Sequence, residues 1–139
     1  MQTSRRHQGG FSLIEGLIAI VIFSIGVLAL IALQVTSVRQ SSNAKYRSDA
    51  ALLANQLIGE MWVSARAGPT LKGNFETGGP LYTQWAATVR ATLPAAAASA
   101  PTVTVDAANG QVEVNVFWKA PNEQDADPQH RYTTIARIQ

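Results

Sequence analysis

Residues 11–33 read FSLIEGLIAIVIFSIGVLALIAL, an apolar run that contains one ionisable residue, Glu15. The hydrocarbon core of a bilayer takes about 20 consecutive apolar helical residues, so this run is long enough to span a membrane. A secretory signal has a shorter apolar core, of about 7–15 residues, with small residues at a cleavage site after that core. Here Gly9 and Gly10 precede the run. The pattern therefore predicts a retained membrane helix and not an ordinary cleaved signal.

The charge distribution predicts how this helix is oriented. The formal net charge of +2 equals the contribution of Arg5 and Arg6, so the rest of the chain carries as many acidic as basic residues. By the positive-inside bias, the two arginines should hold residues 1–10 in the cytoplasm. The remainder would then face outward, into the periplasm of a Gram-negative cell. A neutral remainder gives no basic excess that would indicate nucleic-acid binding.

Glu15 has two possible explanations. An acidic residue at the bilayer centre costs roughly 2.5–3.5 kcal/mol on insertion scales, but Glu15 lies nearer the cytoplasmic end, where an interfacial charge is tolerated. Alternatively, Glu15 has a cationic partner. Cleavage after Gly10 would create one, the α-amine of Phe11, with an ordinary pKa of about 7.7–8. The Glu15 carboxylate and this α-amine pair poorly within one chain but can pair between staggered neighbouring helices. Such a pair fixes the axial register of the helices more than it adds stability.

Two glycines, Gly16 and Gly26, lie within the apolar run. Glycine lowers helix propensity in water, but small residues let membrane helices approach one another closely. Glycine is also frequent in membrane spans generally, so both explanations stay open.

The helical period continues beyond the apolar run. Residues 34–67 contain no proline, and their apolar residues recur at steps of three or four. From residue 50 the apolar face widens, which indicates that a second layer packs there. We expect one helix over about residues 12–67, ended by Gly68-Pro69. Its packing surface for the second layer is expected to comprise Leu53, Leu57, Ile58, Met61 and Trp62.

The next part of the chain is less regular. Residues 68–80 are rich in glycine and proline and predict a loop. Residues 82–93 fit both a helical stripe and a strand alternation, but good helix formers favour a short helix that ends at Leu93-Pro94. Residues 94–101 (PAAAASAP) predict a low-complexity linker.

Alternating valines near the carboxyl end predict strands over about residues 102–106, 111–118 and 131–138. Asn109-Gly110 should form the first hairpin turn, because both residues tolerate positive φ. The expected fold class is α+β, a long N-terminal helix with a small three-stranded antiparallel sheet packed on its C-terminal half. We expect four parts: a leader (1–10), the membrane and assembly half of the helix (11–33), its amphipathic half (34–67) and a small head (68–139).

The segment Gly10-Phe11-Ser12-Leu13-Ile14-Glu15, between a short basic leader and an unbroken apolar run, resembles the class III signal of type IV prepilins. The resemblance implies a type IV pilin-like fold. It also implies that a membrane aspartic peptidase cuts between Gly10 and Phe11 and methylates the new amine, and that Glu15 is the assembly glutamate. Residues 11–67 lack the proline that many major pilins carry in this helix, which argues against a proline-centred kink.

Residues 9–66, the run ALLANQLIGEM and the hairpin ending in VNVFW resemble the PilV branch of minor pilins, the type IV pilus modification proteins. This implies a subunit that primes or modifies pilus assembly within a minor-pilin complex at the tip. Its partners would be the prepilin peptidase and N-methyltransferase, other minor pilins, the major pilin and the inner membrane. The location implied is a single-pass inner-membrane protein with a periplasmic head, and later the extracellular pilus.

An I-type minor pseudopilin of a type II secretion system shares the signal and a similar size, so it stays the alternative. The sequence does not decide which activity depends on the subunit, whether adhesion, twitching or DNA uptake. It also does not decide whether the subunit lies at the tip or in the shaft.

Catalytic and cofactor-binding patterns are missing from the sequence. The chain has no cysteine, which excludes a disulfide, a thiolate metal site and a cysteine nucleophile. His7 lies in the leader and His130 in a polar loop, without a Ser/His/Asp set, a phosphate loop or a metal-ligand cluster. We therefore expect no enzyme activity, no cofactor and no small-molecule substrate.

Two further patterns have an ordinary and a functional interpretation. Glu123, Asp125 and Asp127 alternate in a loop, but their spacing lacks the glycine and distal glutamate of a calcium-binding loop, so a solvated turn is favoured over a metal site. The tryptophans are expected to be core anchors rather than an exposed adhesive patch. They are Trp62, Trp85 and Trp118.

Overall fold

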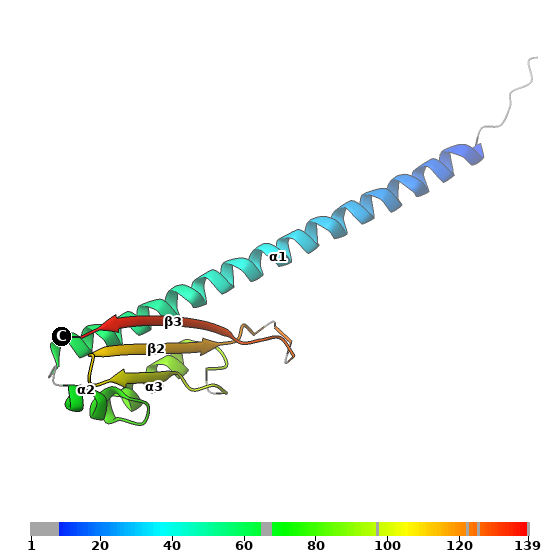
Figure 1. The fold of residues 1–139 in the computed structure, drawn as a ribbon. Helices are drawn as coiled ribbons and strands as arrows, with labels where there is room; N and C mark the ends of the chain where they lie inside the picture. Colours follow the sequence, from blue (N-terminus) through cyan, green and yellow to red (C-terminus); the bar gives the residue numbers. More distant parts are fainter. Residues whose placement is uncertain (1–8, 65–67, 97, 122, 125, 139) are drawn as a thin grey trace, which may run out of the picture. The chain divides into compact units, whose positions relative to one another are not determined.

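The computed structural model describes residues 9–64, 68–96, 98–121, 123–124 and 126–138, with side chains from Ser12 onward. The elements in chain order are α1 (Gly9–Val63), α2 (Gly68–Phe75), α3 (Pro80–Thr92), β1 (Thr102–Asp106), β2 (Gln111–Trp118) and β3 (His130–Arg137) (Figure 1). The chain divides into two compact units, Met1–Gln40 and Ser41–Gln139. The α+β class is confirmed, with a long N-terminal helix and a small three-stranded antiparallel sheet.

The long helix ends at Val63, earlier than the predicted residue 67, and residues 65–67 lie outside the described part of the chain. The predicted loop over 68–80 is wrong for residues 68–75, which form α2. Gly68-Pro69 begins this helix instead of ending the previous one. Proline is tolerated in a first turn because its missing N–H has no partner there. A Cβ at Gly68 would overlap the carbonyl oxygen of Ala107, so glycine lets α2 start against the turn between β1 and β2.

A second Gly-Pro pair, Gly79-Pro80, also begins a helix. Gly79 is the N-cap of α3 and Pro80 its first residue. The helix ends at Thr92, with Leu93 in an extended conformation, because the residue before a proline is disfavoured in the helical region. Residues 82–92 are therefore helix and not strand.

The sheet has the order β1-β2-β3, with both neighbouring pairs antiparallel. Because side chains alternate between the faces of a strand, one face of β1 and β2 is buried, and its residues are Val103, Val105, Val112, Val114, Val116 and Trp118. In β3 the alternate residues are only partly buried. The buried face is the one that must be covered by helices.

The first hairpin turn differs from the expectation of positive φ at both Asn109 and Gly110. Only Gly110 has a positive φ, of 64°. The register pairs Asp106 with Gln111, which leaves a four-residue loop instead of a two-residue turn. The carboxylate of Asp106 organises this loop by accepting hydrogen bonds from the Ala108 N–H at 2.9 Å and the Asn109 side-chain amide at 2.7 Å.

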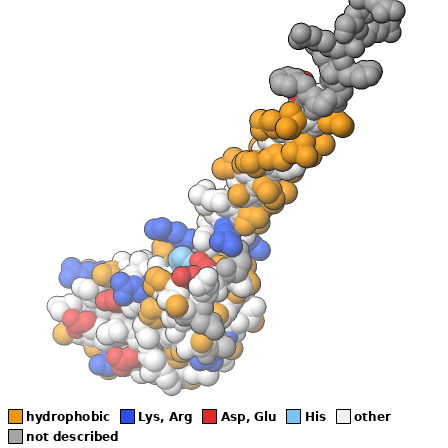
Figure 2. Space-filling view, turned by 90° about the vertical axis from the view of Figure 1, so that its right-hand side faces the viewer, with side chains coloured by type: hydrophobic (Ala, Val, Ile, Leu, Met, Phe, Trp, Pro, Cys, Tyr) orange, Lys and Arg blue, Asp and Glu red, His pale blue; other side chains and the backbone are white. Residues whose placement is uncertain are grey.

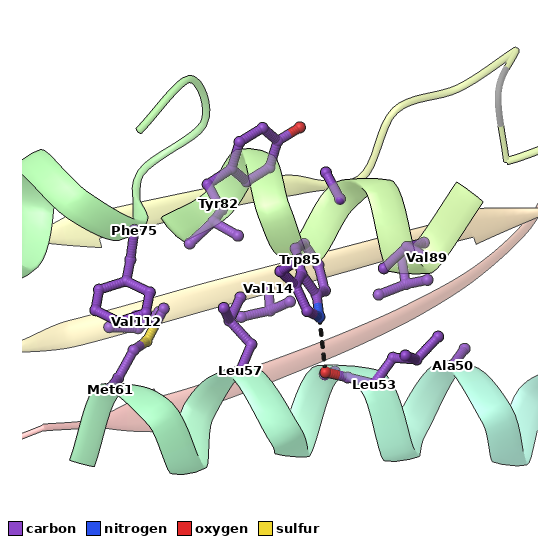
Figure 3. Packing of buried hydrophobic residues seen from close by; sticks show 14 of the residues in the cluster. Ala50, Leu53, Leu57, Met61, Phe75, Tyr82, Trp85, Val89, Val112 and Val114 are labelled. Atoms are coloured by element: carbon purple, nitrogen blue, oxygen red, sulfur yellow. Dashed lines mark hydrogen bonds between the residues drawn. The ribbon is translucent and has the colours of Figure 1, made fainter. Parts of the chain in front are cut away.

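The core of the head lies where α1, α2, α3 and the buried face of the sheet meet (Figure 3). Leu53, Leu57 and Met61 recur at steps of four on the face of α1 that points into this core. Trp85 of α3 reaches across and donates its Nε1–H to the Leu53 carbonyl at 2.9 Å. The Tyr82 hydroxyl donates to the Pro101 carbonyl at 2.6 Å. These two buried polar groups are therefore satisfied inside the head.

The structure buries only some residues of the predicted packing surface of α1. Leu53, Leu57 and Met61 are buried, and Ile58 is partly buried against them. Trp62 is 41% exposed and is not a core anchor. One residue turns a helix by about 100°, so the side chain after Met61 points away from the line of Leu53, Leu57 and Met61.

The segment 94–101 is anchored, although its composition predicted a linker. The Pro94 carbonyl accepts a hydrogen bond from the Lys119 N–H at 3.2 Å, and Ala96 is fully buried. Ala95 takes a φ of 54°, an uncommon conformation for a residue with a Cβ. The chain thus turns sharply after α3 and packs along the end of β2.

Truncation of Leu57 should test whether this core stabilises the head. Leu57 is fully buried, and Leu52, on the same helix, is 67% exposed. We expect Leu57→Ala to lower the free energy of unfolding by about 2–5 kcal/mol and Leu52→Ala to change it by about 0.5 kcal/mol or less. Urea unfolding of the full chain in detergent, followed by tryptophan fluorescence, measures both. Equal losses in the two variants would contradict the assigned inward face.

Candidate functional site

The predicted processing site lies at the start of the described chain. Residues 1–8 of the leader are outside the described part, and α1 begins at Gly9. The backbone at Gly10 and Phe11 is therefore in the first turn of the helix. Cleavage between Gly10 and Phe11, and N-methylation of Phe11, stay predictions.

The first part of α1 exposes apolar side chains around its whole circumference. The helix is long and apolar enough to cross a membrane, and none of its most apolar stretch is buried. The large exposed side chains include Leu13, Ile14, Leu17, Ile18, Ile20, Val21, Ile22, Phe23, Ile25, Val27, Leu28, Leu30, Ile31 and Leu33. A helix that is apolar all round needs an apolar environment, which either a bilayer or neighbouring apolar helices supply.

The hydroxyl groups in this stretch are satisfied by the helix itself. Ser24 donates its hydroxyl to the Ile20 carbonyl at 2.7 Å, and Thr36 donates to the Ala32 carbonyl at 3.0 Å. Bonds to the carbonyl four residues earlier let serine and threonine stay in a helix without a partner from solvent. This matters in a bilayer, where unsatisfied polar groups are costly.

Glu15 is exposed and is the only ionisable residue between Ser12 and Val38. No ion pair joins it to any residue in the described part of the chain. A carboxylate in an apolar environment requires a cation or a hydrogen-bond donor to offset its desolvation. In such an environment the partner of Glu15 would lie outside the described residues of the chain or on another molecule.

Gly16 and Gly26 are not required by the packing of this chain. A Cβ at either position would meet nothing within 4 Å. Beside Gly16 the surface of the helix has a shallow hollow of about 430 Å³ whose lining includes Leu13, Leu17 and Ile20. A small residue that leaves such a hollow allows a neighbouring helix to approach closely. The structure is therefore compatible with close packing beside Glu15.

In the head, His130 is not an isolated loop residue. It is the first residue of β3, pairs with Trp118 of β2, and stacks on the Trp118 ring with centroids 5.5 Å apart. Its Nε2 lies 2.6 Å from Oε1 of Glu123. The sequence could not show this contact, because it depends on the register between β2 and β3 across an eleven-residue connection.

The acidic loop uses its described carboxylates for local hydrogen bonds. Glu123 accepts from the Ala120 N–H at 3.0 Å in addition to contacting His130, and Asp127 accepts from the Gln124 N–H at 2.9 Å. Asp125 lies outside the described residues. Within the described part of the chain, no group of three or more His, Cys, Asp or Glu residues is arranged to hold a metal ion.

Residues 5–31 match a family model described as the prokaryotic N-terminal methylation motif. This match supports a type IV pilin-like protein. It implies processing by a prepilin peptidase, anchoring in a membrane and assembly with other pilins. No curated protein and no solved structure matches the chain. The match covers the signal and most of the apolar run, so the role of the head is argued from the structure of the head itself.

The contact between His130 and Glu123 makes a prediction about stability and pH. The hydrogen bond from His130 lowers the pKa of Glu123 below its ordinary value of 4.5, against an opposing effect of desolvation. A lowered folded-state pKa stabilises the fold at pH values above about 4.5, and this contribution is lost as the pH falls through the folded-state pKa. Glu123→Gln should therefore destabilise the head at pH 6 and lose that effect at low pH.

Urea unfolding of the full chain in detergent at several pH values checks this prediction. Glu60→Gln, at an exposed position of α1, is the control for removing an acidic charge. A difference between wild type and Glu123→Gln that stays constant from pH 6 to pH 2 would contradict the assigned cause.

Proposed function

We propose that the chain is a minor type IV pilin that primes or modifies pilus assembly within a minor-pilin complex at the tip. One observation carries the proposal. The helix that follows the methylation motif is apolar on every side, and its single carboxylate has no ion-pair partner in the described chain. A simple membrane anchor has no need of that carboxylate, whereas a helix that also packs against other helices does.

The mechanism follows from the arrangement of these groups. The chain inserts with residues 1–10 in the cytoplasm and its head in the periplasm. The peptidase hydrolyses the Gly10–Phe11 bond, and the released α-amine of Phe11 is methylated. Glu15 is one helical turn further along, so in a staggered bundle it can accept the amine of a neighbouring subunit. Residues 11–33 then exchange lipid for the apolar helices of other subunits.

The minor-pilin role is supported by the head. It is a small α+β unit without cysteine, and its helix carries no proline from residue 11 to residue 63. A protein with a pilin motif is a structural subunit, so its head acts by choosing neighbours. The alternative is an I-type minor pseudopilin of a type II secretion system, which would use the same helix chemistry with different neighbours. Identification of the co-purifying subunits from native membranes separates the two.

Processing is tested by the intact mass of the protein from its native membrane. We expect a chain that lacks Met1–Gly10 and carries one additional methyl group. Gly10→Val should give an unprocessed chain, because the residue at the cut is changed, and Gly9→Ala should be processed as in the wild type. A full-length, unmethylated wild-type chain in cells with an active prepilin peptidase would overturn the proposed function.

The role of Glu15 is tested by Glu15→Gln, which keeps the shape of the side chain and removes its charge. We expect normal processing, but recovery of the chain with other pilins reduced about tenfold or more, because a buried amine without its carboxylate is costly. Glu15→Asp should restore part of this recovery. Undiminished assembly of Glu15→Gln, measured by quantitative co-purification, would show that Glu15 is a tolerated interfacial charge.

A further inference from the structure

The surface of the head differs from that of the first part of α1. On the face that Figure 2 shows, apolar side chains gather along the first part of α1, whereas apolar, basic and acidic side chains are mixed over the head. A mixed surface gives no general attraction for an apolar neighbour. Contacts of the head with another molecule therefore depend on particular groups, and the sheet presents such groups at one of its edges.

The edge of the sheet at β1 is covered by the chain itself. The strand order β1-β2-β3 makes β1 and β3 the two edge strands. The N–H of Val103 in β1 donates to the Thr77 hydroxyl at 2.8 Å, and the Val103 carbonyl accepts from the Thr77 N–H at 3.1 Å. Helix α2 also contacts β1. The backbone groups of Val103 thus have their partners within the head.

The edge of the sheet at β3 is open. β3 pairs with β2 in a continuous register, and no other backbone hydrogen bond joins β3 to a described residue. The inner-face residues of β3 are only half-buried, whereas those of β1 and β2 are buried. These half-buried residues are His130, Tyr132, Thr134 and Ala136. The helices therefore cover β3 less completely than the other two strands.

One hydrogen bond shows which backbone groups of β3 point to the open edge. The Ile138 N–H donates to the Gly110 carbonyl at 2.8 Å, and these two residues continue the register of β2 and β3. In an antiparallel pair, residues that bond to the neighbouring strand alternate with residues whose backbone groups point away from it. Counting back from Ile138, the even-numbered residues of β3 bond to β2. The N–H and carbonyl groups at the open edge belong to Arg131, Thr133, Ile135 and Arg137.

This edge lacks the features that usually prevent strand pairing. Natural proteins protect an edge strand with proline, lysine, a bulge or a charged residue on the inner face. β3 has eight residues without proline or lysine, its register with β2 has no bulge, and no Asp, Glu, Lys or Arg lies on its inner face. Ile135 is 59% exposed on the outer face. An extended segment of another molecule can therefore add to the sheet at β3.

The charges of β3 indicate what kind of strand fits. Arg131 and Arg137 are exposed on the outer face, and neither forms a salt bridge with a residue in the described part of the chain. In an antiparallel pair of two copies of β3 centred on Thr134, each Arg131 would lie opposite an Arg137. A parallel pair in register would place each arginine beside its own copy. Like charges that face one another across two strands are destabilising, so a second copy of β3 fits poorly.

A strand with acidic residues fits this edge better. Arginine binds carboxylates with charge-assisted hydrogen bonds. The two arginines are six residues apart, which is about 20 Å along a strand, and side chains six residues apart lie on the same face. A partner strand with carboxylates at the same spacing can therefore place one beside each arginine while its backbone bonds to the edge.

We propose that the open edge of β3 pairs with an extended strand of a different pilin subunit, and that this strand carries acidic side chains beside Arg131 and Arg137. Backbone hydrogen bonds supply the attraction, and the arginines select the partner. The identity of the partner as a pilin subunit rests on the proposed function. The capacity of the edge to bind an acidic strand rests on β3 alone.

The first experiment measures binding by the full chain, labelled with ¹⁵N and held in detergent micelles. The probe is the capped heptapeptide EVTVTVE, and its neutral counterpart is QVTVTVQ. We expect EVTVTVE to slow hydrogen exchange of the Thr133 and Ile135 amides about tenfold or more, with little effect on the Thr134 amide, which bonds to β2. The neutral peptide should bind about tenfold more weakly. Unchanged exchange at Thr133 and Ile135, or equal binding of the two peptides, would overturn the proposal.

Substitution of the arginines tests the selection by charge. Arg131→Gln and Arg137→Gln should each weaken binding of EVTVTVE about threefold, the effect of an exposed ion pair, and the double variant about tenfold. Arg90→Gln is the control, because Arg90 is an exposed arginine on α3. If the double variant binds EVTVTVE as tightly as Arg90→Gln does, the assigned chemistry of the partner is wrong.

The role of the backbone is tested at Ile135. Ile135→Pro removes an N–H at the open edge and leaves the bonds between β2 and β3 in place. We expect this variant to bind EVTVTVE at least about tenfold more weakly, and Ile135→Thr, which keeps the N–H, to bind nearly as wild type. Cooperative urea unfolding shows that each variant is folded, and the arginine variants test the site independently. Equal binding by folded Ile135→Pro and Ile135→Thr would contradict strand pairing.

The partner is identified by cross-linking in native membranes, because the chain has no cysteine of its own. Ile135→Cys and Thr104→Cys each take a benzophenone maleimide, and Thr104 is exposed on β1, at the covered edge. We expect only Ile135→Cys to cross-link to another pilin subunit, at a segment that contains acidic residues, as shown by the mass of the joined peptides. A cross-link to a second copy of this chain, or to a segment without acidic residues, would overturn the proposal.

The double variant Arg131→Glu/Arg137→Glu tests assembly in cells. We expect its mass to show normal processing and its co-purification with other pilin subunits to fall about tenfold, while Arg90→Glu behaves as wild type. Normal co-purification of the processed double variant would overturn the assigned partner. An unprocessed wild-type chain would instead overturn the proposed function and leave the binding result in micelles intact.

Discussion

The exposed apolar surface of the first part of α1 is the constraint on which the rest of this protein depends. Each Å² of apolar surface kept from water is worth about 25 cal/mol, and nothing in the described chain covers residues 12–33. Lipid tails and the apolar helices of other subunits remove this surface from water about equally well. Transfer of this helix from the membrane to a bundle of subunits therefore changes the hydrophobic free energy little. Whether the helix stays in the membrane or joins other subunits then depends on its few groups that are not apolar.

Those groups divide between the two units of the chain. In the first unit, Glu15 is the only charge within the apolar stretch, and the hydroxyls of Ser24 and Thr36 bond to their own helix. In the second unit, the same helix presents a narrow apolar stripe that the head buries in its own core. The first part of α1 thus exposes an apolar surface to any apolar neighbour, whereas the apolar stripe of its second part is already covered by the head. Under the proposed function, selectivity among neighbours depends on Glu15 and on the polar surface of the head.

The spacing of apolar residues and the local composition predicted the long helix, the three strands and the α+β class. Each of these features depends on an apolar pattern that repeats within a few residues. The errors arose where distant segments meet. Gly68-Pro69 has the composition of a helix end, but it begins α2, at a place where the nearby Ala107 carbonyl leaves no room for a Cβ. Trp62 has the hydrophobicity of a core residue and lies just beyond the inward stripe of α1. The contact of His130 with Trp118 and Glu123 depends on strand register, which no local pattern contains.

The three tryptophans show why burial alone does not identify a structural residue. Trp62 keeps 41% of its surface exposed, whereas Trp85 and Trp118 are buried to nearly the same extent, at 4% and 3%. The two buried indoles differ in their N–H groups, since that of Trp85 is satisfied by α1 and that of Trp118 is not. An unsatisfied buried donor costs about 1–3 kcal/mol, so the burial of Trp118 lacks a hydrogen bond that the burial of Trp85 keeps. Trp118 therefore contributes through its ring, which is buried and stacks on His130, and not through its N–H group.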